Sequence, residues 1–490
     1  MSLDTPAPGS REDRPSPEPP LTTETEQQAA AEQEAATGSR WSALRPLVLR
    51  LHFYAGLLIA PLLLVAAVSG LLYALSFQAE KIVYRQELTV PDGDRSRALL
   101  PLSDQVAAAR EARPDATVTA VWPSSERGAT TRVLMDAPDV EEGKSLAVFV
   151  NPHTGEIRGE LPSYGSSGAL PLRTWLDELH RDLHLGDAGR HYSELAASWL
   201  WVVALGGLAL WIGRRRTARR ALFVPDRKAK GRRRTLSLHG TVGLWAAVGL
   251  VLLSATGLTW SRYAGENIGA VQDQLGGATP AVSASLDGAS GGGGEHAGHG
   301  GGTGGAHQGA DVGIDRALAA ARTAGIDGPL AVTLPTDATG YVVKETDTTF
   351  PVRLDSVAVN PADGRVMDEL RFADYPVLAK LTRFGIDAHM GVFLGLANQL
   401  ALAALALALI LVIVWGYRMW WQRRPTRGRA LTGGRPVPRG TWRRVPPALL
   451  FALAALTVLI GWFVPLLGIS LAAFLVVDLA LGAAARSRRA

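Results

Sequence analysis

Long apolar runs alternate with polar segments along this chain of 490 residues. Because about 20 apolar residues suffice to cross the hydrocarbon core of a bilayer, each long run predicts a membrane span. The final stretch is long enough for two spans, which Pro465 and Gly468 are expected to separate as a tight hairpin. The pattern predicts an all-α membrane bundle of about six transmembrane helices, over residues 47–76, 192–213, 238–261, 386–421, 446–465 and 467–484.

Two long polar stretches, 77–190 and 262–385, follow the first and third predicted spans. In each stretch a helix-like segment, 102–112 or 314–325, precedes β-rich runs. Both β-rich runs end in an Asn-Pro-x-x-Gly sequence, which predicts a hairpin turn between strands. The stretches therefore predict two small α+β domains, and the unit of span, domain and span occurs twice.

Basic segments indicate the orientation of the bundle. Residues 214–237 and 422–445 are rich in Arg and Lys, and the chain ends in RSRRA. With six spans, all of these segments fall on one side, which the positive-inside rule makes cytoplasmic. We therefore expect a multi-pass protein of the cell (inner or plasma) membrane with both termini in the cytoplasm and both α+β domains outside. The C-terminal hairpin then occupies residues 446–484.

Two segments lack a folding pattern. Residues 1–40 are rich in Pro, Glu, Ala, Thr and Ser, which is typical of a disordered tail, and no signal-peptide cleavage site is evident. Residues 287–312 form a Gly-rich linker ahead of the second domain. Three histidines in this linker could bind a metal ion weakly, although the entropy of ordering so many glycines favours a plain linker: His296, His299 and His307.

The composition and the absence of known motifs exclude several kinds of cofactor and catalytic site. The chain has no cysteine, which excludes Cys-ligated iron–sulfur clusters, covalently attached haem, thiol catalysis and disulfides. The net charge of +5 gathers at span ends, so we expect no nucleic-acid partner. No metalloprotease, Walker, Rossmann or Ser/His/Asp pattern is present, and no catalytic residue is predicted.

The same histidine pattern opens two apolar runs. His52 and His239 each begin a His-x3-Gly-x13-Gly sequence, in LHFYAGLLIAPLLLVAAVSGL and LHGTVGLWAAVGLVLLSATGL. A lone polar ring in lipid is costly, so two rings at the same depth indicate a shared partner. Facing imidazoles beside small residues are typical of a membrane haem, because His supplies the axial nitrogen and Gly permits close approach.

Further histidines lie toward the other side of the membrane. His389 opens the fourth predicted span, and His180, His184 and His191 precede the second. An Arg-Arg pair follows both His180 and His389 after the same interval of 34 residues, which makes His180 the duplicate of His389. His184 would lie one turn along the same helical face and remains an alternative ligand. His191 is expected to be interfacial.

Paired histidines on both sides predict two haem b groups, separated by about 20 Å within a core of about 30 Å. Ligation by two imidazoles leaves no open iron position and favours electron transfer over oxygen chemistry. Three arginines near the candidate ligands could pair with haem propionates or could simply mark the span ends: Arg50, Arg181 and Arg234. Asn398 and Gln399, inside the fourth span, are expected to form hydrogen bonds within the bundle.

These motifs resemble a known family. The two LHxxxG spans with their Ser/Thr-Gly-Leu triplets, the LHRxLxLG segment, the HxGxxxG sequence at His389 and the Asn-Pro-x-x-Gly strand ends are similar to the PepSY-associated transmembrane proteins. That family includes PiuB-type iron-regulated membrane proteins. The resemblance covers about 45–425 and leaves the C-terminal hairpin unassigned. His184 stands where the motif commonly has an aliphatic residue.

The resemblance implies that the outward domains are PepSY domains and that His52, His180, His239 and His389 bind haem. Some members are inner-membrane ferric-siderophore reductases, which implies a haem-dependent oxidoreductase acting on a ferric siderophore or another iron chelate. The chain has no flavin or nicotinamide site, so a quinol or another reductase would have to donate the electrons. The alternative is a membrane-anchored PepSY module for binding, sensing or protease modulation, without redox activity.

Overall fold

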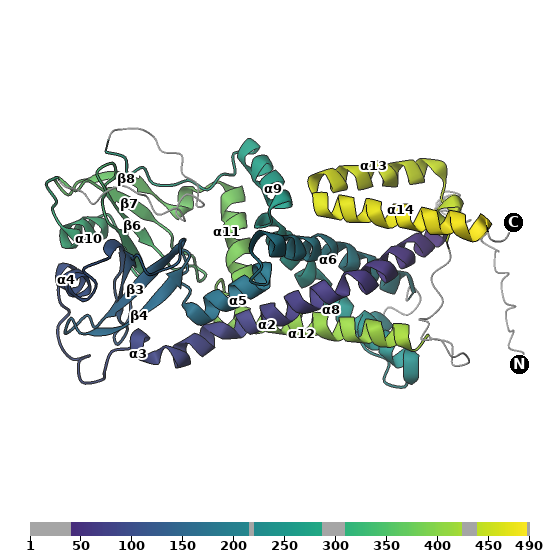
Figure 1. The fold of residues 1–490 in the computed structure, drawn as a ribbon, viewed down its shortest axis with the longest axis horizontal. Helices are drawn as coiled ribbons and strands as arrows, with labels where there is room; N and C mark the ends of the chain where they lie inside the picture. Colours follow the sequence, from purple (N-terminus) through teal and green to yellow (C-terminus); the bar gives the residue numbers. More distant parts are fainter. Residues whose placement is uncertain (1–40, 215–219, 287–308, 424–438, 488–490) are drawn as a thin grey trace, which may run out of the picture.

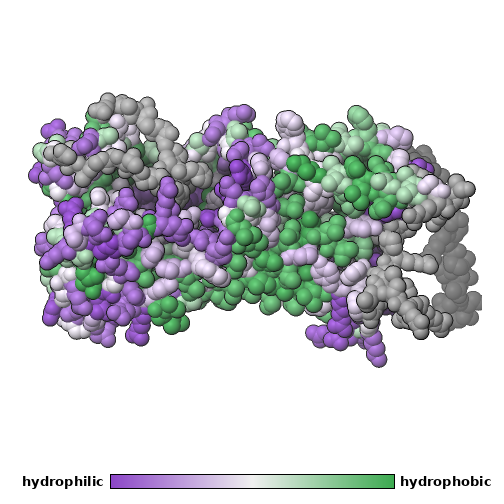
Figure 2. All heavy atoms as spheres, viewed as in Figure 1, coloured by the Kyte–Doolittle hydropathy of each residue, from purple (hydrophilic) through white to green (hydrophobic). Residues whose placement is uncertain are grey.

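The structure is a computed structural model and describes residues 41–214, 220–286, 309–423 and 439–487. The predicted tail at 1–40 and most of the predicted linker lie outside these ranges. Figure 1 shows an elongated molecule with a β-sheet at one end and a helical bundle along the rest. In Figure 2, apolar residues gather over the bundle and hydrophilic residues over the sheet, as a membrane protein with an aqueous domain requires.

The described residues contain five helices that are long and apolar enough to cross a membrane, rather than the six expected. The other member of the C-terminal hairpin, α13 (Pro447–Phe463), is a shorter apolar helix of 17 residues. The five candidate spans are α2 (Ala60–Val83), α6 (Gly186–Arg214), α8 (Gly231–Thr259), α12 (Leu396–Trp421) and, within α14 (Pro465–Ser487), residues 465–484.

The first span is interrupted at Ile59, two residues before Pro61. Residues 41–58 are helical, and α2 continues after a turn at Ile59. Because Pro61 has no N–H, the Leu57 carbonyl four residues earlier lacks its usual helical donor. The Tyr417 hydroxyl of α12 donates to this carbonyl over 3.0 Å. A hydrogen bond between helices thus satisfies a backbone group that lipid could not.

The expected fourth span, 386–421, is two helices. Its first part belongs to α11 (Val377–Met390), which ends at Gly391 with φ 87°, and α12 begins after Gly395 with φ 55°. Both angles fall in the left-handed region that glycine adopts without strain, so the two glycines stop one helix and start the next. The first repeat has the same break between α5 (Pro171–Asp182) and α6.

The two predicted α+β domains are one unit. Their strands form a single antiparallel sheet of eight strands in the order β4-β3-β2-β1-β5-β6-β7-β8. The halves join where β1 pairs with β5, with Val121 opposite Val332. The prediction of two separate domains was wrong because β1 and β5, which would each be an edge strand of an isolated half, pair their free backbone groups with each other. The strands are β1 (Thr117–Trp122), β2 (Thr131–Asp136), β3 (Lys144–Val150), β4 (Ile157–Tyr164), β5 (Leu330–Thr333), β6 (Tyr341–Glu345), β7 (Ser356–Val359) and β8 (Val366–Leu370).

One hydrophobic core serves both halves of the sheet. The helices α4 (Leu102–Ala112) and α10 (Ile314–Thr323) pack against it together, with Ala109 and Ala317 fully buried. The Asp315 carboxylate of α10 accepts the backbone N–H groups of Leu102 (2.7 Å) and Ser103 (3.1 Å) at the start of α4. This cap ties the halves together through a helix terminus.

The predicted hairpin turns are confirmed. In the turn between β3 and β4, the Gly155 N–H donates to the Asn151 carbonyl over 2.9 Å, and between β7 and β8 the Gly364 N–H donates to Asn360 over 2.9 Å. Both glycines have positive φ, 74° and 75°. The remaining described elements are α3 (Arg85–Leu88), α7 (Arg220–Phe223), α9 (Tyr263–Gln274), η2 (Phe372–Asp374) and η3 (Thr441–Arg444).

Candidate functional site

Four histidines form two pairs inside the bundle. His52 and His239 have ring centroids 6.2 Å apart, at the end of the bundle that carries the Arg-rich segments, and we call them the basic-side pair. His180 and His389 have ring centroids 6.5 Å apart, at the end nearer the sheet, and we call them the sheet-side pair. Each repeat of the chain supplies one ring to each pair, so the duplication is expressed as two symmetric sites.

Backbone carbonyls orient the basic-side rings. The Nδ1 atom of His52 lies 3.0 Å from the Val203 carbonyl of α6, and Nδ1 of His239 lies 2.9 Å from the Val412 carbonyl of α12. A carbonyl can only accept, so Nδ1 carries the proton in both rings. The other nitrogen, Nε2, is then left with a lone pair, which is the form of imidazole that binds a metal.

Hydroxyl groups orient the sheet-side rings. Nδ1 of His180 lies 2.9 Å from Ser69 Oγ, and Nδ1 of His389 lies 2.7 Å from Thr256 Oγ1. The Ser69 hydroxyl already donates to the Val65 carbonyl (2.8 Å), and Thr256 donates likewise within its own helix. Each hydroxyl therefore accepts from the ring, and Nε2 again keeps its lone pair.

Glycines bring these rings close to neighbouring backbones. A Cβ added at Gly207 would lie 2.9 Å from His52 Cε1, and one at Gly70 would lie 3.2 Å from His180 Cε1. The glycines one turn after the basic-side histidines differ, because no atom lies within 4 Å of a Cβ placed at Gly56 or Gly243. Small residues thus surround both pairs and leave space beside the basic-side pair.

A buried ion pair fixes the start of α5, which carries His180. The Glu80 carboxylate of α2 accepts the backbone N–H groups of Leu170 (3.1 Å) and Arg173 (3.2 Å). Arg173 Nε also lies 3.1 Å from Glu80, with both side chains less than a tenth exposed. Helices α2 and α5 are thereby locked together, which sets His180 against Ser69.

His184, the alternative ligand, faces elsewhere. The helix α5 ends at Asp182, and His184 has φ 56°, so it does not continue the helical face that carries His180. Its ring packs on Trp175 at 4.9 Å, and its Nδ1 lies 3.3 Å from Glu178. The structure therefore brings His180, and not His184, to His389.

The other predicted polar residues have structural partners. His191 Nδ1 lies 2.9 Å from the Asp187 carbonyl. Asn398 donates to the Ala388 carbonyl (2.8 Å) and Gln399 accepts from Gln78 (2.9 Å), which confirms their expected role in the bundle.

The three arginines that were considered as partners of haem propionates differ in their contacts and in their exposure to solvent. Arg181 donates to Tyr164 (2.8 Å) and lies 3.4 Å from Asp177, whose pKa is raised by burial. Arg50 pairs with Asp478, and Arg234 is exposed near the start of α8. The linker histidines His296, His299 and His307 lie outside the described residues, within which no cluster of three metal-ligating side chains occurs.

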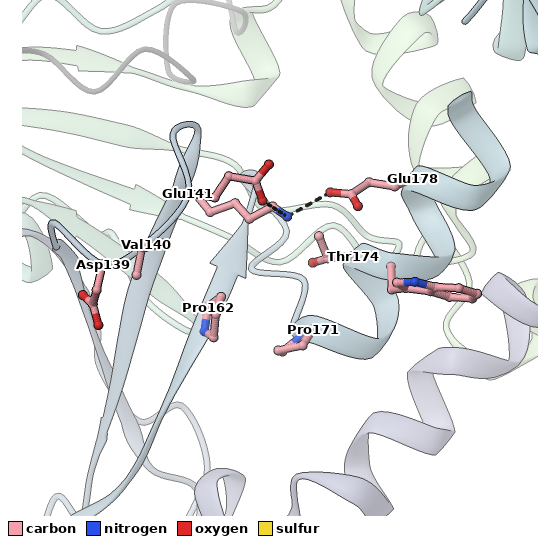
Figure 3. Close-up of a pocket in the computed structure, with 9 residues that line it drawn as sticks. Asp139, Val140, Glu141, Pro162, Pro171, Thr174 and Glu178 are labelled. Carbon is pink, nitrogen blue, oxygen red and sulfur yellow. Dashed lines mark hydrogen bonds and ion pairs between the residues drawn. The ribbon is translucent and has the colours of Figure 1, made fainter. Parts of the chain in front are cut away.

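A separate cavity of about 240 Å³ lies between the β2–β3 loop and α5 (Figure 3). Lys144 bridges Glu141 (2.9 Å) and Glu178 (3.0 Å) across it, and Trp175 forms part of the wall. None of the four paired histidines lines this cavity.

A family model described as PepSY-associated TM region matches residues 49–423, which is more than half of the chain. The chain belongs to this family. A search of curated proteins finds no match. The PepSY-associated region contains both histidine pairs and the whole sheet, and it ends before α13 and α14.

Sequence reasoning missed the groups that orient the rings. Ser69 and Thr256 precede the far glycines of the duplicated pattern, and these matched hydroxyl residues are a signal in the sequence that could have located them. The Val203 and Val412 carbonyls had no such signal, because every residue has a carbonyl.

Proposed function

We propose that each histidine pair holds one haem b and that the protein carries electrons across the membrane to a ferric chelate. The observation that supports this proposal is the spacing of the rings. Two imidazoles on opposite sides of one metal ion, each bonded at about 2 Å, have ring centres about 6 Å apart. The pairs lie at 6.2 and 6.5 Å. In all four rings Nδ1 is the atom engaged by a neighbouring group, which leaves the Nε2 lone pair available for such ligation.

The surroundings of the rings fit a flat macrocycle. The open space beside Gly56 and Gly243 would accept part of its edge, and the apolar walls would exclude water. A haem held by both imidazoles of a pair would supply reversible one-electron chemistry. In this proposal His52 and His239 are the ligands of one haem, and His180 and His389 are the ligands of the other. Ser69, Thr256 and the carbonyls of Val203 and Val412 fix the tautomers of these rings.

The two pairs lie at opposite ends of the bundle. His52 and the sheet-side partner Ser69 are 17 residues apart along the first span, and His239 and Thr256 are 17 residues apart along α8. At 1.5 Å per residue this places the pairs about 25 Å apart along the helix axes. In the proposed orientation the basic side is cytoplasmic, and electrons leave at the sheet side.

The identity of the proposed electron acceptor is inferred from the family resemblance. A ferric siderophore or another iron chelate would gain one electron at the sheet side, and the resulting Fe(II) is held less tightly by hard oxygen ligands. The donor would be a quinol or another reductase on the opposite side. The sheet would then provide the docking surface beside the sheet-side pair.

Spectroscopy of purified protein tests the proposal. We expect about two haem b per chain and the reduced-minus-oxidised spectrum of low-spin, bis-imidazole iron. Reduced protein in liposomes should be reoxidised by a ferric siderophore added on the sheet side. Colourless protein from haem-sufficient cells would contradict the proposal. If removal of the sheet then changed the activity of an extracytoplasmic protease, a PepSY binding module would replace it.

A further inference from the structure

The C-terminal hairpin lies outside the PepSY-associated region but is attached to it at both ends. Near the sheet side, Asn267 of α9 donates to the Phe463 carbonyl over 2.9 Å. Trp199 of α6 donates to Ser470 Oγ of α14 over 2.9 Å. Hydrogen bonds between helices are a main source of specific association in membranes. The hairpin is therefore a fixed part of the bundle, which Figure 1 shows beside α6 and α9.

At the basic side the attachment is ionic. Asp478, the one acidic residue of α13 and α14, forms an ion pair with Arg50. The side chain of Arg50 is 9% exposed and that of Asp478 22% exposed. Arg439, which is 40% exposed, approaches the same carboxylate at 3.0 Å. An acidic residue in an apolar membrane helix is costly unless it is paired, so the ion pair with Arg50 stabilises the position of Asp478.

The ion pair lies next to the basic-side pair in the chain. Arg50 precedes His52 by two residues, which places the two side chains on opposite sides of one helix. Arg50 pairs with Asp478 of α14, and its guanidinium lies 4.9 Å from the ring centroid of Tyr54. The Tyr54 ring in turn packs on Phe474 of α14. The guanidinium thus carries a buried charge two residues along the chain from His52, on another face of the same helix.

We propose that Asp478 is a positioning residue for the basic-side site, which holds the Arg50 guanidinium and offsets its charge, and thereby sets the reduction potential of the group bound by His52 and His239. This inference rests on the proposed function. A nearby positive charge favours the reduced form of iron, and in an interior of low dielectric the effect of one charge extends over several ångströms. The added hairpin therefore tunes electron entry into the family region.

Redox titration of the haem-loaded full chain tests the proposal. Asp478→Asn should raise the potential of the basic-side component and leave the sheet-side component unchanged. Arg50→Gln should lower the same component, and the double variant should return close to the unaltered protein. Asp478→Glu, which keeps the negative charge, should leave the potential of the basic-side component close to that of the unaltered protein. Arg439→Gln is the matched control, and its shift should be smaller because water and salt screen an exposed charge.

The signs of the shifts separate charge from packing. Loosening of the hairpin would move the potential in the same direction in Asp478→Asn and Arg50→Gln, and that result would overturn the proposal. Unshifted potentials in haem-loaded variants would also overturn it and leave the proposed function intact. Unaltered protein without haem would overturn both.

Discussion

The two histidine pairs have almost the same spacing but are built differently. His52 and His239 lie on long membrane helices, and backbone carbonyls of the neighbouring spans hold their Nδ1 atoms. His180 and His389 lie on the shorter helices α5 and α11, and side-chain hydroxyls hold their Nδ1 atoms. The basic-side pair is thus fixed by the helices themselves, whereas the sheet-side pair depends on particular side chains.

This difference determines which substitutions can change the orientation of the rings in each pair. A backbone carbonyl cannot be removed by a side-chain substitution, so the Nδ1 acceptors of the basic-side rings cannot be deleted one at a time. A hydroxyl can be removed, so the sheet-side pair can be altered one ring at a time. The helices α5 and α11 also follow β4 and β8 along the chain, so the sheet-side pair lies on the helices that lead from the sheet into the bundle.

Ligand substitutions should have the largest effect and separate the two pairs. His52→Ala and His239→Ala should each reduce or abolish binding of one haem, and His180→Ala and His389→Ala binding of the other, because each variant removes one of the two proposed iron ligands. Haem stoichiometry with a redox titration of each variant gives the answer. His184→Ala is the control for His180→Ala and should retain both components. Loss of the same component in His52→Ala and His389→Ala would show that the pairing is wrong.

A second comparison lies within the basic-side pair. Gly207→Ala would place a Cβ 2.9 Å from His52 Cε1, which forces the ring to move, whereas Gly416→Ala would place one 3.8 Å from His239 Cε1, an ordinary contact. We expect Gly207→Ala to lower occupancy of the basic-side component and Gly416→Ala to leave it unchanged. Difference spectra at fixed protein concentration measure both. Equal occupancy in the two variants would mean that ring position does not limit binding.

Removal of the hydroxyls should affect only the sheet-side pair. Ser69→Ala and Thr256→Val leave Nδ1 of His180 or His389 without its acceptor, and loss of such an orienting partner typically lowers metal affinity 10–100-fold. Thr256→Ser keeps the acceptor and serves as the control. Haem retention during dilution, followed for each component, tests this. A similar loss from the basic-side component would indicate general unfolding.

Much of this architecture followed from the sequence, and the failures have physical causes. The duplicated His-x3-Gly-x13-Gly pattern located His52 and His239, and the repeat interval to the Arg-Arg pairs distinguished His180 from His184. The break at Gly391 was missed because hydropathy averages over the short polar-free turn between α11 and α12. The pairing of β1 with β5 was missed because it joins segments about 200 residues apart.

The smallest expected effect concerns the break at Ile59 in the first span. Tyr417→Phe removes the donor to the Leu57 carbonyl, which Pro61 cannot serve. Hydrogen bonds between membrane helices are worth about 0.6 kcal/mol on average, so we expect a loss of about 0.5–1.5 kcal/mol in unfolding free energy. The loss should appear first in the basic-side pair, since Leu57 lies in the helical segment that carries His52. In a Pro61→Ala background the backbone N–H of residue 61 can serve the carbonyl, and Tyr417→Phe should then cost less. Thermal unfolding in detergent, followed by the absorbance of each component, gives the two costs. If the two costs were equal, the Tyr417 hydroxyl would not be substituting for the helical donor that Pro61 lacks.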